Sequence, residues 1–262
     1  MTDSVLFDID GAVATITLNR PAARNSLTVE MKNALIHALG RCASDETVRS
    51  VLVTGAGPAF CAGQDLREHA ELLAGGGSPL DTVREHYNPI VMAIATLPKP
   101  VVAALPGVAA GAGASLAFAC DFRIAVSGAS FLMAFARVGL GADTGASWTL
   151  QRLVGAAKAT ELLMLAEPVP ADEALRLGLL NQVVPDAGEL AAQARALAGR
   201  LAAGPTAAYG AIKEALRFAA ASGLAEALDK EADLQERLGA TADHRAATTA
   251  FINKVQPAFL GH

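Results

Sequence analysis

The sequence predicts an α/β core followed by an all-helical C-terminal region. Short apolar runs typical of buried strands alternate with helix-like segments over about two thirds of the 262 residues. From Glu189 onward, the apolar residues recur at helical spacing only. This alternation fits a spiral of ββα turns as well as a doubly wound sheet, so the two arrangements stay open at this level.

The first elements are an opening hairpin and a capped helix. Alternating apolar residues lie on both sides of Asp10-Gly11, a pair that is typical of a two-residue hairpin turn. Ser26 or Thr28 is expected to cap a helix, because apolar residues recur at helical spacing from residue 31 to residue 39.

The middle of the chain alternates buried strands with helices. Strands are expected at 48–54, 101–105, 122–126 and 183–184. Helices are expected from about Asp65 onward and at 81–97, 111–119, 147–153 and 156–166. Gly204-Pro205 is the expected boundary between a core at 1–203 and a helical region at 204–262.

The composition argues against several classes of protein. A net charge of −5 argues against a nucleic-acid partner, because phosphate contacts need a basic surface. The longest uncharged run, 101–120, is interrupted by Pro106 and several glycines, so no membrane span is expected. Three cysteines without a close pair fit reduced thiols of a cytoplasmic protein, and the N-terminus lacks the pattern of a signal peptide. The 52% hydrophobic content predicts burial against other subunits.

Two segments share one design, in which a turn of small residues opens into a helix. They are FCAGQDL at 60–66 and GVAAGAGAS at 107–115. A helix start offers unpaired backbone N–H groups, and small residues let a ligand oxygen approach them. Two such turns facing each other would hold one oxyanion; alternatively, the glycines only permit tight turns and close helix packing. Dinucleotide and phosphate-loop motifs are missing, and no cluster has the spacing of metal ligands.

Together with NRPAARNSL at 19–27 and VGLGADTGASW at 138–148, these segments resemble the crotonase superfamily of enoyl-CoA hydratases and isomerases. The resemblance covers about residues 5–260. It implies a crotonase-type spiral of ββα turns with a C-terminal helical region that forms a homotrimer or a dimer of trimers. It also implies an acyl-CoA thioester as substrate, with coenzyme A as part of that substrate and no permanently bound cofactor.

The resemblance implies particular site residues as well. The backbone N–H groups of Gln64 and Ala112 would form the oxyanion hole for the thioester carbonyl. Positions that would contact the substrate or its CoA are Ala23, Arg24, Ala62, Asp65, Leu66, Gly111, Ser115, Phe135 and Val138. Phe251 and Lys254 match a late motif that reaches a CoA near a subunit interface, although Lys254 also fits an ordinary solvated lysine.

The two carboxylate positions of a hydratase are filled by Ser115 and Phe135, which cannot deprotonate water. One carboxylate remains, Asp143, at a position where isomerases of the superfamily carry an aspartate. The alternative interpretation of Asp143 is a helix N-cap or a simple turn aspartate. We therefore expect an acyl-CoA isomerase of fatty or aromatic acid catabolism, similar to ring-epoxide isomerases of phenylacetate degradation. A hydratase and a non-catalytic CoA-thioester-binding subunit are the alternatives.

Overall fold

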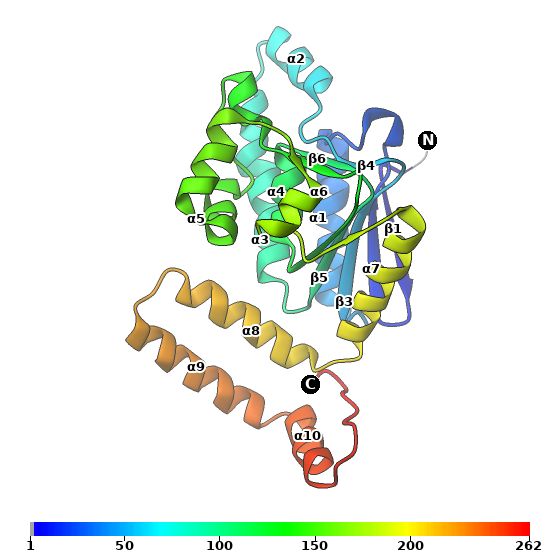
Figure 1. Ribbon diagram of the computed structural model, residues 1–262, viewed down its shortest axis with the longest axis vertical. Coiled ribbons are helices and arrows are strands. Elements are labelled where there is room, and N and C mark those ends of the chain that lie inside the picture. Colours follow the sequence, from blue (N-terminus) through cyan, green and yellow to red (C-terminus); the bar gives the residue numbers. More distant parts are fainter. Residues whose placement is uncertain (1–2) are drawn as a thin grey trace.

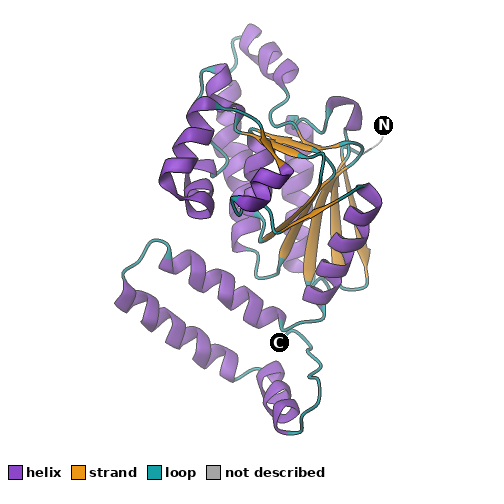
Figure 2. Cartoon of the chain, viewed as in Figure 1, coloured by secondary structure: helices purple, strands orange, loops and turns teal. Residues whose placement is uncertain are grey.

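The computed structural model describes residues 3–262, and these residues form two sheets with helices around them (Figures 1 and 2). The large sheet has six strands in the order β1 (Val5–Asp10), β2 (Val13–Leu18), β3 (Ser50–Gly55), β5 (Val101–Leu105), β7 (Phe122–Val126) and β10 (Gln182–Val184). The small sheet has four strands in the order β4 (Ala59–Cys61), β6 (Val108–Ala110), β8 (Ser130–Leu132) and β9 (Val169–Pro170).

The path of the chain between the sheets is a spiral of ββα turns. Three successive units each place their first strand in the large sheet (β3, β5, β7) and their second strand in the small sheet (β4, β6, β8). Neighbouring units pair in parallel, with Val51 opposite Val101 in one sheet and Ala109 opposite Phe131 in the other. The structure therefore has the spiral arrangement and not the doubly wound sheet.

The expected strands of the large sheet are confirmed, as is the hairpin at Asp10-Gly11 between β1 and β2. The strands of the small sheet were not predicted. In particular, the segments of small residues at 60–66 and 107–115 each contain residues of a short strand, β4 or β6, before the helix that follows.

Helices cover the large sheet and connect the units. They are α1 (Val29–Ser44), α2 (Leu66–Ala74), α3 (Asn88–Thr96), α4 (Ala112–Ala119), α5 (Ala146–Leu165), α6 (Ala171–Arg176) and α7 (Ala187–Ala202). Shorter helical turns are η1 (Pro21–Ala23), η2 (Pro79–Asp81), η3 (Val83–Tyr87) and η4 (Ala134–Val138). α7 packs on β3, β5 and β7, and α1 packs on β1 and β2. The central strand β5, which lies between β3 and β7 under α7, is buried along its whole length.

Local signals account for most helix limits. Thr28 caps α1 through its hydroxyl, and the Asp65 carboxylate accepts the N–H groups of Arg67 and Glu68 at the start of α2. The single helix expected at 81–97 is wrong in detail, because its first turn, η3, is a π-helix. Pro89 lacks an N–H group and cannot continue the ladder of α-helical hydrogen bonds there.

The C-terminal helices α8 (Thr206–Ala219), α9 (Leu224–Gly239) and α10 (Ala242–Ile252) lie at the opposite end of the molecule from α2 (Figure 1). Lys213 of α8 forms an ion pair of 2.8 Å with Asp121 of the core. The expected boundary at Gly204-Pro205 falls in the turn between α7 and α8, and the division into two domains stays a prediction. Within residues 3–262, every helix is too short or too polar to cross a membrane.

Candidate active site

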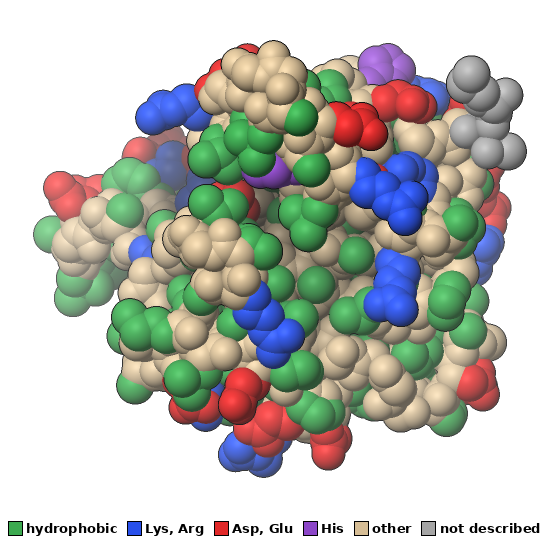
Figure 3. Space-filling view, turned by 90° about the horizontal axis from the view of Figure 1, so that it is seen from above, with side chains coloured by type: hydrophobic (Ala, Val, Ile, Leu, Met, Phe, Trp, Pro, Cys, Tyr) green, Lys and Arg blue, Asp and Glu red, His purple; other side chains and the backbone are tan. Residues whose placement is uncertain are grey.

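A cavity of about 600 Å³ lies between the two-sheet core and α2. Its walls come from the β4–α2 loop, α2, the segment at 77–87, the start of α4, η4 and the loop that precedes α5. On the face that Figure 3 shows from above, hydrophobic side chains gather around a hollow, and separate Lys and Arg side chains lie on the surrounding surface. Gln64, Ala112 and Asp143 all line this cavity, so the three segments that the sequence singled out meet there.

The two loops that carry Gln64 and Ala112 pack against each other through their backbones. A Cβ atom on Gly63 would lie 2.8 Å from the Ala110 carbonyl oxygen and 3.3 Å from the Ala112 nitrogen. A Cβ atom on Gly113 would lie within 2.7 Å of the Cys61 side chain, and closer still to its carbonyl oxygen. Only glycine permits this approach, and Gly63 also has a φ of +86°. The two turns therefore lie against each other, which is the arrangement that a shared oxyanion site would require.

The backbone N–H groups of Gln64 and Ala112 are not used inside the protein. Leu27 bonds to the residues on both sides of Gln64: its N–H donates to the Gly63 carbonyl, and its own carbonyl accepts the N–H of Asp65. The N–H of Gln64 takes no part in this pairing. Ala112 is the first residue of α4 and has no acceptor one turn before it. Among residues 3–262, neither N–H group has a protein acceptor, which leaves two donors for a ligand oxygen at the cavity.

Asp143 is the one carboxylate among the residues that line the cavity. Burial raises the pKa of its side chain above the ordinary value, although the hydroxyl of Thr144, which donates to Oδ1 at 2.7 Å, and the charge of Lys32 act in the opposite direction. The N-cap interpretation is wrong, because Gly145 caps α5 and the N–H of Ala146 bonds to the main-chain carbonyl of Asp143, not to its carboxylate. Its carboxylate is therefore available for a proton transfer.

A buried polar group behind the cavity wall was not predicted from the sequence. Lys32 of α1 has no exposed surface, and its Nζ donates to Gln64 Oε1 at 3.1 Å and to Thr82 Oγ1 at 2.5 Å. Tyr87 donates its hydroxyl to the same Gln64 oxygen at 2.5 Å. The sequence signal was a lysine next to Met31 on the apolar face of a helix, where a charged residue is rare unless it has partners.

Several other predicted residues share the cavity, whereas some do not. Those that line it are Ala62, Leu66, Gly111, Phe135 and Val138. Ser115 does not, because it is fully buried and its hydroxyl donates to the Gly111 carbonyl at 3.1 Å.

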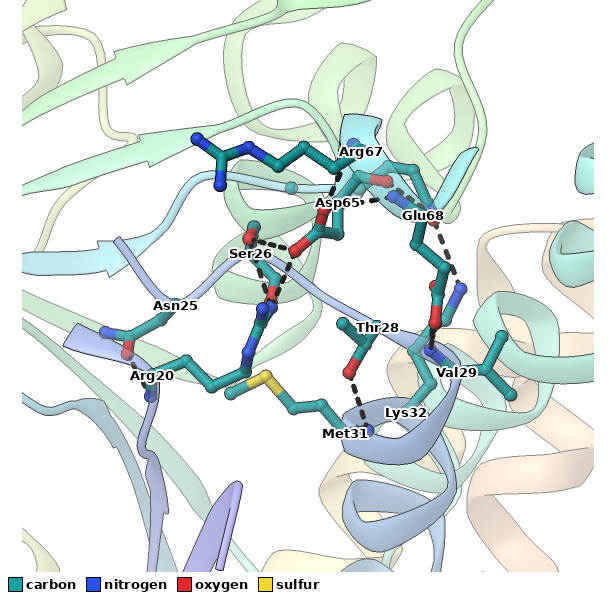
Figure 4. A network of polar contacts seen from close by, with 12 residues as sticks. Arg20, Asn25, Ser26, Thr28, Val29, Met31, Lys32, Asp65, Arg67 and Glu68 are labelled. Carbon is teal, nitrogen blue, oxygen red and sulfur yellow. Dashed lines mark hydrogen bonds and ion pairs between the residues drawn. The ribbon is translucent and has the colours of Figure 1, made fainter. Parts of the chain in front are cut away.

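Asp65 and its neighbours hold the loop in place behind the cavity. The Asp65 carboxylate accepts from Arg20 at 2.8 Å and from the Ser26 hydroxyl at 2.9 Å, as Figure 4 shows. The carbonyl of Arg24 accepts the N–H of Ala62 at 2.9 Å. Ala23, Arg24 and Asp65 thus lie beside the loop without lining the cavity, and their contacts with CoA stay a prediction.

Phe251 and Lys254 lie near the end of α10, far from this cavity in the same chain. The Phe251 side chain is 84% exposed. A contact with a CoA would therefore have to involve the cavity of another subunit, and this role stays a prediction.

Metal and thiol chemistry find no support at the site. Within residues 3–262, no three or more His, Cys, Asp or Glu side chains are grouped as metal ligands would be. Burial raises the pKa of the Cys61 thiol to about 12, so this cysteine beside the Gln64 loop is not an activated nucleophile.

Comparison with known proteins agrees with the geometry. Residues 8–262 match the family described as enoyl-CoA hydratase/isomerase. The chain is 42% identical over 262 residues to the 1,2-epoxyphenylacetyl-CoA isomerase of Escherichia coli, with full coverage of both chains. It is also 42% identical over 259 residues to a probable enoyl-CoA hydratase of Rhodobacter capsulatus, covering 98% of each.

A solved structure confirms the predicted fold type. A crystal structure described as an enoyl-CoA hydratase/isomerase from Mycobacterium abscessus superposes with a TM-score of 0.94 at 44% identity. The superposition covers 98% of this chain and 100% of the other. The protein has the crotonase-type fold, and it belongs to the enoyl-CoA hydratase/isomerase family.

Proposed function

We propose that the protein is an acyl-CoA isomerase that uses Asp143 as its single acid and base. The observation that carries this proposal is the set of chemical groups that line the cavity. One carboxylate lies there together with the unpaired N–H groups of Gln64 and Ala112. A reaction that removes a proton from one carbon and returns it to another needs one such group and one anion site.

The proposed reaction begins with the thioester oxygen bound between the two N–H groups. The Asp143 carboxylate accepts a proton from the α-carbon, and the C–H bonding electrons form a dienolate whose negative charge rests on the thioester oxygen. The protonated Asp143 then donates that proton to the γ-carbon, so a 3-enoyl thioester becomes a 2-enoyl thioester. Oxyanion donors of this kind typically contribute about 10²–10³ each to the rate.

Asp143 is suited to both steps because of where it lies. Burial raises its pKa, which makes it a stronger base than an exposed aspartate. The cavity also has apolar walls, among them Leu66, Phe135 and Val138, which would exclude water from it when an acyl chain is bound.

Hydration is the alternative within the same family. The two positions where the resemblance places hydratase carboxylates are Ser115, which is buried and bonded to a carbonyl, and Phe135, which offers only a ring to the cavity. The 42% identities to an isomerase and to a hydratase are equal and do not separate the two activities. The preference for isomerisation therefore rests on the cavity alone.

The test compares the wild type with Asp143→Asn on trans-3-hexenoyl-CoA and on crotonyl-CoA. We expect isomerisation of the first thioester, little hydration of the second, and loss of about 10²–10⁴ in isomerase kcat in the variant. Calorimetric binding of the product thioester should be kept, because the two N–H donors remain. Rapid hydration of crotonyl-CoA, or unchanged isomerisation by the variant, would refute the proposal. Thioester binding without turnover of either probe by the wild type would favour a non-catalytic subunit.

We further propose a homotrimer or a dimer of trimers in a reducing, cytoplasmic compartment. Large apolar side chains are exposed along the C-terminal helices, namely Ile212, Leu216, Leu224, Leu228, Phe251 and Ile252. Exposed apolar surface of this kind is typical of an interface. A monomeric mass by sedimentation at micromolar concentration would refute the oligomer. The buried free cysteines support the compartment, because they form no disulfide frame.

A further inference from the structure

We propose that Lys32 is a positioning residue of the isomerase, whose buried ammonium group fixes the Gln64 loop and balances the negative charge of the cavity through the reaction. This inference rests on the function proposed above, and it concerns a residue that lies behind the cavity wall. The proposal rests on the contacts of Lys32, on the orientation that they impose on the Gln64 side chain, and on the charges around Lys32.

The contacts join three segments of the chain behind the cavity. Lys32 on α1 donates to Gln64 Oε1, in the β4–α2 loop, and to Thr82 Oγ1, just before η3. Tyr87 at the end of η3 donates to the same Gln64 oxygen, and the Lys32 Nζ lies 5.1 Å from the centre of the Tyr87 ring. Gln64, Thr82 and Tyr87 all line the cavity, whereas Lys32 stands behind them.

The ammonium group determines how the Gln64 side chain is oriented. An ammonium group has only donors, so the carbonyl oxygen of the carboxamide must face Lys32, and the NH₂ group must face away. Residue 64 is thereby tied to α1 and η3 through its side chain. Its backbone N–H is the proposed oxyanion donor. A shift of about 1 Å in such a donor costs roughly 10²-fold in rate, so this clamp affects catalysis without contact to the substrate.

The charge of Lys32 has no direct partner in residues 3–262, since no carboxylate lies within 4.0 Å of its Nζ. An isolated buried charge is costly. Burial lowers the pKa of Lys32, whereas the charges of Glu68 and Asp65 at the start of α2 and of Asp143 at the cavity raise it. His86, which bonds to Thr82, is a further titratable group beside it.

Negative charge is present in the cavity throughout the proposed reaction. It lies first on the Asp143 carboxylate and then on the dienolate, before it returns to Asp143. A fixed positive charge behind Gln64 stabilises both the Asp143 carboxylate and the dienolate relative to a cavity with protonated Asp143 and no other negative charge. The charge does not have to move during the proton transfers. In accordance with this, Lys32 lowers the pKa of Asp143 and so opposes the effect of burial.

A matched control is Lys99, a second buried lysine with a purely structural environment. Its Nζ donates to the main-chain carbonyls of Cys42 at 2.6 Å and of Asp45 at 2.7 Å, and it has no contact with the cavity. Methionine has nearly the length of lysine without its charge. Lys32→Met and Lys99→Met therefore separate the effect of a charge at the site from the effect of removing any buried lysine.

The first measurement is the pH titration of the Asp143 carboxyl group by ¹³C NMR, with its resonance assigned from the spectrum of Asp143→Asn. Loss of the nearby positive charge should move the Asp143 titration to higher pH in Lys32→Met and leave it unchanged in Lys99→Met. This measurement needs no turnover, so it can fail independently of the proposed activity. An unchanged Asp143 titration in Lys32→Met would overturn the proposal.

The second measurement is isomerase kinetics with trans-3-hexenoyl-CoA, together with thermal unfolding. We expect Lys32→Met to lower kcat by about 10–10² with little change in KM, and to shift the acidic limb of the rate profile to higher pH. Both variants remove a buried charge that bonds only to uncharged acceptors, so their melting temperatures should change in the same direction. Lys99→Met should keep kcat. A Lys32→Met variant that behaves like Lys99→Met would show a structural role only and would overturn the proposal.

Discussion

Replacing Gly63 with alanine should separate the two loops of the candidate oxyanion hole. The new Cβ would lie 2.8 Å from the Ala110 carbonyl oxygen, about half an ångström short of the 3.4 Å at which ordinary contact begins. It would also lie 3.3 Å from the Ala112 nitrogen, one of the two proposed donors. Because the clash is with backbone atoms and not with the end of a flexible side chain, the loops themselves must move apart.

Two costs can be estimated for this substitution. A positive φ of +86° at a non-glycine residue costs about 1–2 kcal/mol, which lowers stability. The separation of the loops acts on catalysis, because a misplacement of about 1 Å costs roughly 10²-fold. A movement of half that size should lower kcat by between about 10-fold and 10²-fold, with a smaller effect on KM.

Gly178→Ala is the matched control. Gly178 has a φ of +80°, but its nearest atom to an added Cβ is the Leu153 carbonyl oxygen at 3.9 Å, and it lies outside the cavity. Steady-state kinetics with trans-3-hexenoyl-CoA and urea unfolding should be run on both variants. Both should lose stability through the positive φ, Gly63→Ala should lose more because only its Cβ meets backbone atoms, and only Gly63→Ala should lose kcat. A Gly63→Ala enzyme with wild-type kcat would refute the inference that the two loops act together.

Three further predictions concern charge and stability. Burial raises the pKa of Asp143, so its folded form binds a proton more tightly than its unfolded form; Asp143→Asn should therefore raise the melting temperature at pH 7 and have no such effect below pH 3.8. Two cations of α9 lower the pKa of Glu214 to about 2, so Glu214→Gln should cost about 1 kcal/mol at pH 7, with the loss fading as the pH falls from 4.5 to 2. Lys213→Met should lower the free energy of unfolding in urea by about 2–3 kcal/mol, because it leaves the Asp121 carboxylate without its ion pair. Equal melting curves of variant and wild type at pH 7 would contradict the first two, and an unchanged urea midpoint the third.

Signals that act within a few residues predicted much of the fold. The hairpin at Asp10-Gly11 and the caps at Thr28 and Asp65 depend on neighbouring backbone groups, so a single sequence contains them. The small sheet could not be predicted in this way. Most of its strands have three residues, and they exist because Cys61 meets Ala109, and Ala109 meets Phe131, across long loops.

The candidate site likewise contains residues that the sequence could predict and residues that it could not. Gln64, Ala112 and Asp143 lie in motifs that could be found, and the structure places all three at one cavity. Lys32 could not be placed, because what distinguishes it from a solvated lysine is its position beneath Gln64 and beside Tyr87. The sequence around Asp143 contains no cation that faces it. The cation that affects its pKa comes from α1, and only the fold brings the two together.

The number of carboxylates in the cavity restricts the chemistry more than any single contact does. Addition of water to a 2-enoyl thioester needs one group to accept a proton from water and a source of a proton for the α-carbon. Two carboxylates perform these tasks most readily, because neither has to change partner during the reaction. A double-bond shift makes the opposite demand, since the group that takes the proton should also return it. Asp143 is the one carboxylate that lines the cavity, and the cavity also contains two unpaired N–H groups, which suits the second demand. Its removal takes away the one carboxylate of the cavity, so the residual rate of Asp143→Asn should no longer show the acidic limb of the wild-type pH profile.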